Sequence, residues 1–116
     1  MLKIGVLGAG HLGKIHLKVL AASSVYSLIG FYDPNPEVKA VLSKSLGYKA
    51  FESPEKLIAA CDVIDIVTPT LFHFDLAMLA LNTKKHVFIE KPIATSDNEA
   101  KAIVALANNN GVMGMV

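Results

Sequence analysis

The sequence lacks several features that would point to particular classes of protein. It has no tryptophan and one cysteine, Cys61, so no disulfide can form within the chain and nothing indicates an oxidising compartment. Eleven basic and ten acidic residues leave a net charge of +1 with no block of one sign, which argues against nucleic acid as a partner. No apolar run reaches the length of a membrane span, and the N-terminus has no secretory signal pattern. We therefore expect a cytoplasmic protein with no membrane partner.

The length and composition indicate one globular domain. The chain has 116 residues, of which 53% are hydrophobic and 18% charged, enough to bury a single core. The four histidines and Cys61 show no spacing typical of metal ligands, and no Ser-His-Asp arrangement is evident, so we predict neither a metal site nor a covalent nucleophile. A homo-oligomer is compatible with such a sequence.

Short apolar runs alternate with segments of helix length along the whole chain. This alternation is typical of βαβ units that build a parallel sheet. The six runs are mostly continuous rather than alternating, as strands covered on both faces are. The predicted strands are residues 2–7, 28–32, 48–51, 63–67, 86–89 and 112–116.

Helix start and stop signals separate these runs. Ser53 before Pro54 is a typical N-terminus, and Ser96 followed by Glu99 matches a capping box. Gly47 and Gly111 stand where helices would end. The spacing predicts further helices over residues 11–22 and 73–81 and a last one over 97–109. We expect an α/β fold with a doubly wound parallel sheet, strand order 3-2-1-4-5-6 and helices on both faces.

A glycine motif lies between the first predicted strand and the first predicted helix. Residues 8–13, GAGHLG, match the Gly-x-Gly-x-x-Gly fingerprint of dinucleotide-binding Rossmann domains. Gly8 would allow the tight turn, Gly10 would let the backbone approach a diphosphate, and Gly13 would let helix and strand pack closely. Free amides at the helix N-terminus would bind the diphosphate. His11 and Leu12, at the variable positions, are expected beside the cofactor.

An acidic residue follows at the expected distance. Asp33 ends the second predicted strand, twenty residues after Gly13, where an acid binds the adenosine ribose hydroxyls. The run Asp33-Pro34-Asn35-Pro36 is also typical of a turn, and the two roles are compatible. Asp33 would repel a 2′-phosphate and the chain has no arginine to bind one, so we predict NAD rather than NADP as the cofactor.

Two later motifs lie at the predicted carboxyl ends of strands, the edge where ligands bind in open α/β sheets. They are TPTLFH from Thr68 to His73 and KHVFIEKP at residues 85–92. Together with the glycine motif, His16 three residues after it and Asp33-Pro34-Asn35, they resemble the glucose-fructose oxidoreductase and inositol dehydrogenase (Gfo/Idh/MocA) family over essentially the whole chain.

The resemblance implies NAD(P)-dependent hydride transfer to or from a sugar, a polyol or a related hydroxyl or carbonyl substrate. It implies that Lys91 lies beside the nicotinamide and the substrate hydroxyl, where an ammonium would stabilise alkoxide charge and relay a proton. It further implies that Thr68 and Pro69 contact the cofactor through their backbone. His73 and Glu90 would line the nicotinamide side.

Two polar residues receive no functional role from the sequence. His16 is interpreted as either a packing or a capping residue. Asp65 interrupts an apolar strand and, because a buried carboxylate needs partners, is expected either near the domain edge or hydrogen-bonded.

The resemblance also implies a second, substrate-binding domain that would follow residue 116 and is absent from this sequence. Residues 1–116 would then be a truncated cofactor domain that binds NAD(H) and has little or no turnover alone. The alternative of a different class is a stand-alone module that binds or senses NAD(H) without catalysis. A methyltransferase shares the glycine loop and the acid but does not suit the two later motifs.

Overall fold

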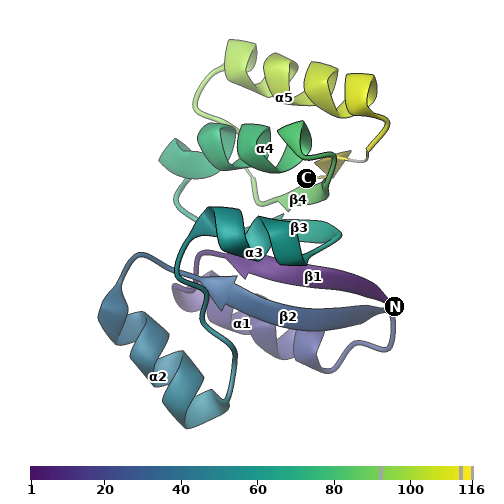
Figure 1. The fold of residues 1–116 in the computed structure, drawn as a ribbon. Coiled ribbons are helices and arrows are strands. Elements are labelled where there is room, and N and C mark those ends of the chain that lie inside the picture. The colour runs from purple at the N-terminus through teal and green to yellow at the C-terminus, as the bar shows by residue number, and fades with distance from the viewer. Residues whose placement is uncertain (92, 113, 116) are drawn as a thin grey trace.

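The computed structural model describes residues 1–91, 93–112 and 114–115, and its strands form one parallel sheet (Figure 1). The strands are β1 (Leu2–Leu7), β2 (Tyr26–Tyr32), β3 (Val63–Ile66), β4 (His86–Ile89) and β5 (Gly114–Met115). The helices are α1 (His11–Ala21), α2 (Pro36–Leu46), α3 (Pro54–Ala60), α4 (His73–Asn82) and α5 (Asp97–Asn110), with a 3₁₀ turn, η1 (Thr70–Phe72), before α4.

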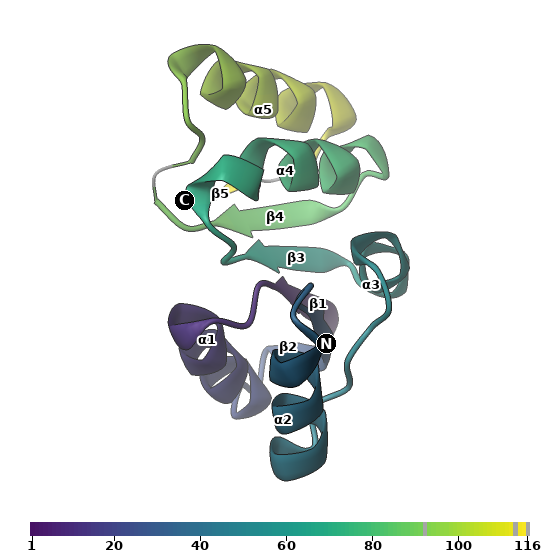
Figure 2. The same ribbon diagram turned by 90° about the vertical axis from the view of Figure 1, so that its left-hand side faces the viewer.

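The sheet has the strand order β2-β1-β3-β4-β5, and all neighbouring strands are parallel. The carboxyl ends of the strands therefore share one edge. In Figure 2 the arrowheads of β3 and β4 point to this edge, and α1 begins there. Switch points at this edge bind ligands in open α/β sheets, so the fold places the glycine motif where a dinucleotide would lie.

The prediction of six strands is wrong for the described residues, which contain five. Residues 48–51 form a single parallel bridge, Ala50 to Phe31, in the place expected for the third strand beside β2. Two backbone hydrogen bonds hold it, from Phe31 N to Lys49 O and from Phe51 N to Phe31 O, both 2.9 Å. The stretch is too short for a ladder, because the cap of α2 at Gly47 precedes it and the cap of α3 at Ser53 follows. The last predicted strand is β5, with residues 113 and 116 outside the described part.

The helix ends follow the local signals of the sequence. The Ser53 hydroxyl accepts a hydrogen bond from the Lys56 amide at 3.2 Å, and Pro54 occupies the first turn of α3. Gly47 and Gly111 end α2 and α5 in the left-handed conformation, with φ of 74° and 67°. These caps place the helices where the pattern predicts, within one or two residues.

Helices cover the two faces of the sheet with separate cores. On one face α1 and α2 pack through Leu17 and Leu42 against Val6 of β1 and Phe31 of β2. On the opposite face, α3, α4 and α5 pack on the sheet through a larger cluster. Its buried members are Leu7, Leu57, Ile58, Cys61, Ile64, Ile66, Ala77, Ala80, Leu81, Val87, Ile89, Ile103 and Ala107.

None of the helices in the described ranges combines the length and the apolar character that crossing a membrane requires.

Candidate functional site

The glycine loop has the backbone geometry that its three glycines permit. Gly8 has a φ of 97°, a conformation that side chains disfavour, and its amide donates to Tyr32 O at 2.9 Å. A Cβ on Gly13 would overlap the carbonyl oxygen of Gly8, so helix α1 packs directly on the turn. A Cβ on Gly10 would meet no atom within 4 Å. Gly8 and Gly13 are therefore needed by the fold, whereas Gly10 leaves open space for a ligand.

The N-terminus of α1 is available to an anion. The first α1 amide with a backbone partner one turn back is that of Lys14, which donates to Gly10 O at 2.9 Å. Gly10 provides no side-chain cap, and the first turn contains no acidic residue. The positive end of the helix dipole and the amides of the first turn therefore face no acidic side chain from α1 itself, as in a diphosphate site.

Asp33 joins the end of β2 to the glycine loop. Its Oδ2 accepts a hydrogen bond from the Ala9 amide at 2.8 Å, and its Oδ1 accepts one from the Asn35 amide at 2.9 Å. Asn35 in turn caps α2 by accepting from the Glu37 amide at 2.9 Å. The carboxylate thus has both the turn role and a fixed position beside the loop. Each oxygen retains a lone pair with which it can accept from a ribose hydroxyl.

These residues line a cleft of about 780 Å³ along the ligand edge, termed here the cofactor cleft. A volume of this size is typical of cofactor sites. Of the residues predicted from sequence, the cleft brings together Gly8, Gly10, His11, Leu12, Asp33, Thr68 and Pro69. Tyr32, Pro34, Asn35, Val38, Pro54, Val67, Phe72, Asp75 and Leu76 complete its lining.

Thr68 and Pro69 form a wall of the cofactor cleft. A Cβ on Gly8 would lie 2.7 Å from the Thr68 amide nitrogen, so this wall lies directly against the glycine loop. The Thr68 hydroxyl is buried and has no hydrogen-bond partner among the described residues. His73 is buried behind the wall and is not among the cleft-lining residues. Its Nε2 lies 2.7 Å from Thr68 O. His73 therefore shapes the cleft through the Thr68 backbone.

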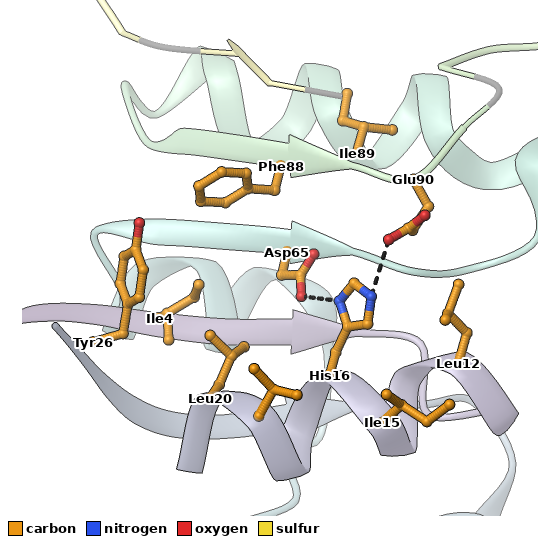
Figure 3. Close-up of a pocket in the computed structure, with 11 residues that line it drawn as sticks. Ile4, Leu12, Ile15, His16, Leu20, Tyr26, Asp65, Phe88, Ile89 and Glu90 are labelled. Atoms are coloured by element: carbon orange, nitrogen blue, oxygen red, sulfur yellow. Dashed lines mark hydrogen bonds and ion pairs between the residues drawn. The ribbon is translucent and has the colours of Figure 1, made fainter. Parts of the chain in front are cut away.

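Glu90 and Lys91 lie outside the cofactor cleft, after the end of β4. Lys91 is exposed, and Glu90 lines a second hollow of about 400 Å³ on the α1 face of β3 and β4. Most of this second hollow is apolar, lined by residues such as Ile4, Leu20 and Phe88 (Figure 3).

A histidine between two carboxylates lies at the end of the second hollow. His16 Nδ1 is 2.6 Å from Asp65 Oδ2, and His16 Nε2 is 2.9 Å from Glu90 Oε1 (Figure 3). Asp65 lies in the central strand β3 and is buried, with 5% of its surface exposed. Burial raises the pKa of its carboxyl, while the hydrogen bond from His16 acts in the opposite direction. The expectation that Asp65 is hydrogen-bonded is confirmed, and the alternative position at the domain edge is wrong.

The role of His16 as the centre of this triad was missed from the sequence. Its partners are 49 and 74 residues away, so no local spacing connects them. The available signal was Asp65, since a carboxylate inside an apolar strand requires a hydrogen-bond or charge partner.

The motifs agree with comparisons to known proteins. Residues 2–116 match the model of the Gfo/Idh/MocA group, described as an oxidoreductase family with an NAD-binding Rossmann fold. Over 106 residues the chain is 40% identical to UDP-N-acetylglucosamine 3-dehydrogenase of Acidithiobacillus ferrooxidans, a match that covers 91% of this chain and 33% of that protein. Over 100 residues it is 37% identical to glucose-6-phosphate 3-dehydrogenase of Bacillus subtilis, a match that covers 86% of this chain and 29% of that protein.

The fold agrees equally well with solved structures. A structure of the Acidithiobacillus ferrooxidans UDP-N-acetylglucosamine 3-dehydrogenase superposes with a TM-score of 0.89 at 37% identity, over 96% of this chain and 36% of that one. The chain thus spans about a third of the length of the relatives that it matches. The family match over nearly every residue shows that the chain belongs to the Gfo/Idh/MocA oxidoreductases, in their NAD-binding Rossmann domain.

Proposed function

We propose that this chain binds NAD(H) in the cofactor cleft and forms the cofactor domain of an oxidoreductase that acts on a sugar, a polyol or a related hydroxyl or carbonyl compound. The observation that carries the proposal is the hydrogen bond from the Ala9 amide to Asp33, beside the open space at Gly10. It joins an anion site and a ribose acceptor in one rigid corner. An adenine dinucleotide presents a diphosphate and a ribose diol in that arrangement.

The fit to the cofactor is supported at three points of the cleft. The uncapped N-terminus of α1 would hold the diphosphate, with Gly10 allowing its close approach. The Asp33 carboxylate would accept from the adenosine ribose hydroxyls, and His11 and Leu12 would lie beside the cofactor. Thr68 and Pro69 would form the wall that the cofactor contacts. The buried Thr68 hydroxyl in this wall has no partner in the described ranges.

We infer that NAD is preferred over NADP. A 2′-phosphate would lie against the Asp33 carboxylate, whose two oxygens are held in place by backbone amides. The chain contains no arginine that could compensate this repulsion.

The nicotinamide half would extend towards the ends of β3 and β4. When bound, NAD supplies the hydride acceptor and NADH the hydride donor. His73 would act by fixing the Thr68 carbonyl, and Glu90 would lie on the nicotinamide side. The exposed ammonium of Lys91 would stabilise negative charge on the substrate oxygen and help to move its proton.

The substrate would be held by residues outside this domain. Residues 1–116 would bind the cofactor. The relatives are about three times as long, so their remaining residues are available for the substrate. Both relatives named above are, by their names, dehydrogenases of sugar derivatives, which supports a substrate of that class. Without a pocket that holds substrate against the nicotinamide, this chain should bind NAD(H) and turn over little.

Calorimetric titration of the chain with NAD, NADP and S-adenosylmethionine tests the proposal. We expect NAD to bind most tightly and S-adenosylmethionine not to bind. Tighter binding of NADP would overturn the cofactor preference, and binding of S-adenosylmethionine alone would overturn the oxidoreductase assignment. In an enzyme that contains this domain, Lys91→Ala should lower turnover far more than NAD affinity. An unchanged rate would remove Lys91 from the reaction.

A further inference from the structure

We propose that His16 is a positioning residue, which ties the segment carrying Lys91 to the helix that holds the diphosphate. The inference rests on the proposed function, because it concerns the nicotinamide half of the same cofactor. His16 lies on α1, three residues after Gly13, and its ring reaches across the sheet edge to Asp65 on β3 and to Glu90 after β4 (Figure 3).

The two contacts of His16 require two bridging protons. A neutral imidazole has one N–H and one acceptor nitrogen, whereas two ionised carboxylates can only accept. Either both ring nitrogens donate to ionised carboxylates, or one nitrogen donates to an ionised carboxylate and the other accepts from the second carboxyl group in its protonated form. In both cases the three groups hold a net charge of −1 and the ring is fixed at both ends. A histidine can satisfy two carboxyl groups in this way with one compact ring.

Stability alone does not account for the triad. The surrounding hollow is also lined by Ile4, Leu20 and Phe88, so apolar residues in place of the whole triad would suit this environment. Burying Asp65 costs desolvation, and buried ion pairs are often no more stabilising than apolar residues of similar volume. A polar link at this place therefore points to a role in function.

Two contacts hold Glu90, one through its backbone and one through its side chain. The Glu90 amide donates to Ile66 O at 3.1 Å, which holds its backbone to β3. Its side chain is held to α1 by His16 at 2.9 Å. Lys91 follows Glu90 directly, and its side chain is exposed. His16 thus links α1 to the residue directly before Lys91, and the separation between the N-terminus of α1 and Lys91 would have to match the distance from diphosphate to nicotinamide.

Two ligands distinguish a positioning role from a structural one. ADP-ribose contains the adenosine, the diphosphate and a ribose but lacks the nicotinamide ring, whereas NADH contains the whole cofactor. For the chain with His16→Asn, which can donate towards Asp65 but is too short for Glu90, we expect NADH affinity to fall by about tenfold, the equivalent of one charge-assisted hydrogen bond. ADP-ribose affinity should change less than about twofold. The emission of bound NADH, which reports on the nicotinamide surroundings, should shift towards that of free NADH.

Conservative variants provide the rescue. His16→Gln has a donor that reaches further towards Glu90, and Glu90→Gln keeps an oxygen that can accept from His16, so both should restore most of the NADH affinity. Glu90→Ala breaks the same link at a partly exposed residue and should also lower NADH affinity about tenfold, which keeps the test decisive if His16→Asn fails to fold. His86→Gln, at the opposite end of β4, is the matched histidine control.

The outcomes separate this inference from the proposed function. If the unaltered chain binds neither NADH nor ADP-ribose, the proposed function fails. If it binds both, and His16→Asn and Glu90→Ala weaken the two ligands equally or not at all, the positioning role of His16 is overturned while the proposed function stands.

Discussion

Asp33 and Ala9 are joined by a hydrogen bond of 2.8 Å, in which the carboxylate at the end of β2 accepts from an amide inside the glycine loop. One side chain therefore holds a loop amide in place and puts a carboxylate beside the proposed anion site. The two effects can be separated by substitution, because an amide oxygen can replace the acceptor without replacing the charge.

We predict that Asp33→Asn keeps NAD binding within about tenfold of the unaltered chain and binds NADP more tightly than the unaltered chain does. The Asn oxygen can still accept from Ala9, and repulsion of the 2′-phosphate is removed. Asp33→Ala should weaken both cofactors, because the loop loses its tether. Calorimetry with NAD and NADP on the three proteins measures this. An unchanged NADP affinity in Asp33→Asn would show that the carboxylate does not determine the preference.

The glycine loop allows binding to be separated from folding. In Gly10→Ala the new methyl group meets nothing within 4 Å, and the backbone φ of −69° suits alanine, so the free energy of unfolding should stay within about 0.5 kcal/mol. NAD affinity should fall at least tenfold, because the methyl group occupies the space proposed for the diphosphate. Urea unfolding and NAD titration of the same sample provide the two measurements. Full NAD affinity in this variant would place the diphosphate elsewhere.

Gly13→Ala should show the opposite order of effects. Its Cβ would overlap the Gly8 carbonyl oxygen, a backbone atom that can move only with the loop. We expect the free energy of unfolding to fall by about 1–3 kcal/mol, the usual cost of overpacking, with NAD binding lost as a consequence. Its urea midpoint, compared with that of Gly10→Ala, tests this. Equal stability of the two variants would contradict the packing argument.

The helix ends depend on information that is local in the sequence. Ser53, Gly47 and Gly111 act on their own helix ends, so the pattern predicts these ends well. Residues 48–51 have the composition of a strand, but the caps on either side leave room for one bridge only. A strand prediction from composition alone does not include that limit.

The functional residues divide in the same way. The corner of Gly8, Gly10 and Asp33 follows from a motif with known spacing, and the structure brings these residues together in one cleft. The triad of Asp65, His16 and Glu90 depends on how β3 and β4 lie against α1, which only the assembled sheet determines. The sequence indicates that Asp65 needs a partner but not which residue provides it.

Cys61 should be protected from thiol reagents in the folded chain. It is 1% exposed, and desolvation raises its pKa from 9.0 to about 11, so at pH 8 about one thiol in a thousand would be ionised. Because the folded pKa is raised, its contribution to stability is present below 9.0 and is lost as the pH rises towards 11. Labelling with a disulfide reagent at pH 8 should be slow in buffer and fast in urea. Rapid labelling in buffer would contradict the burial.

Asp65 leads to a pH dependence of stability that bears on the role of His16. Desolvation raises its pKa above the usual 3.8, so the folded state binds the proton more tightly than the unfolded state does. The stability contributed by Asp65 is therefore fully present below 3.8 and is lost as the pH rises through the higher, folded value. Asp65→Asn does not titrate at this position, so the difference between the two proteins reports the proton binding of Asp65 together with its coupling to His16 and Glu90. We predict that the free energy of unfolding of the unaltered chain, minus that of Asp65→Asn, is smaller at about pH 7 than at about pH 3.5.

Urea unfolding of both proteins at the two pH values measures this difference. Asp62→Asn is a matched control, because Asp62 lies on the same segment and its carboxylate accepts from the Lys3 amide at the exposed end of the sheet. A difference that grows with pH would mean that ionised Asp65, paired with His16, stabilises the fold. The triad would then be explained by stability, and the case for His16 as a positioning residue would lose its energetic argument. A difference that shrinks would mean that ionising Asp65 costs the fold stability, as expected of groups retained to hold Glu90 in place.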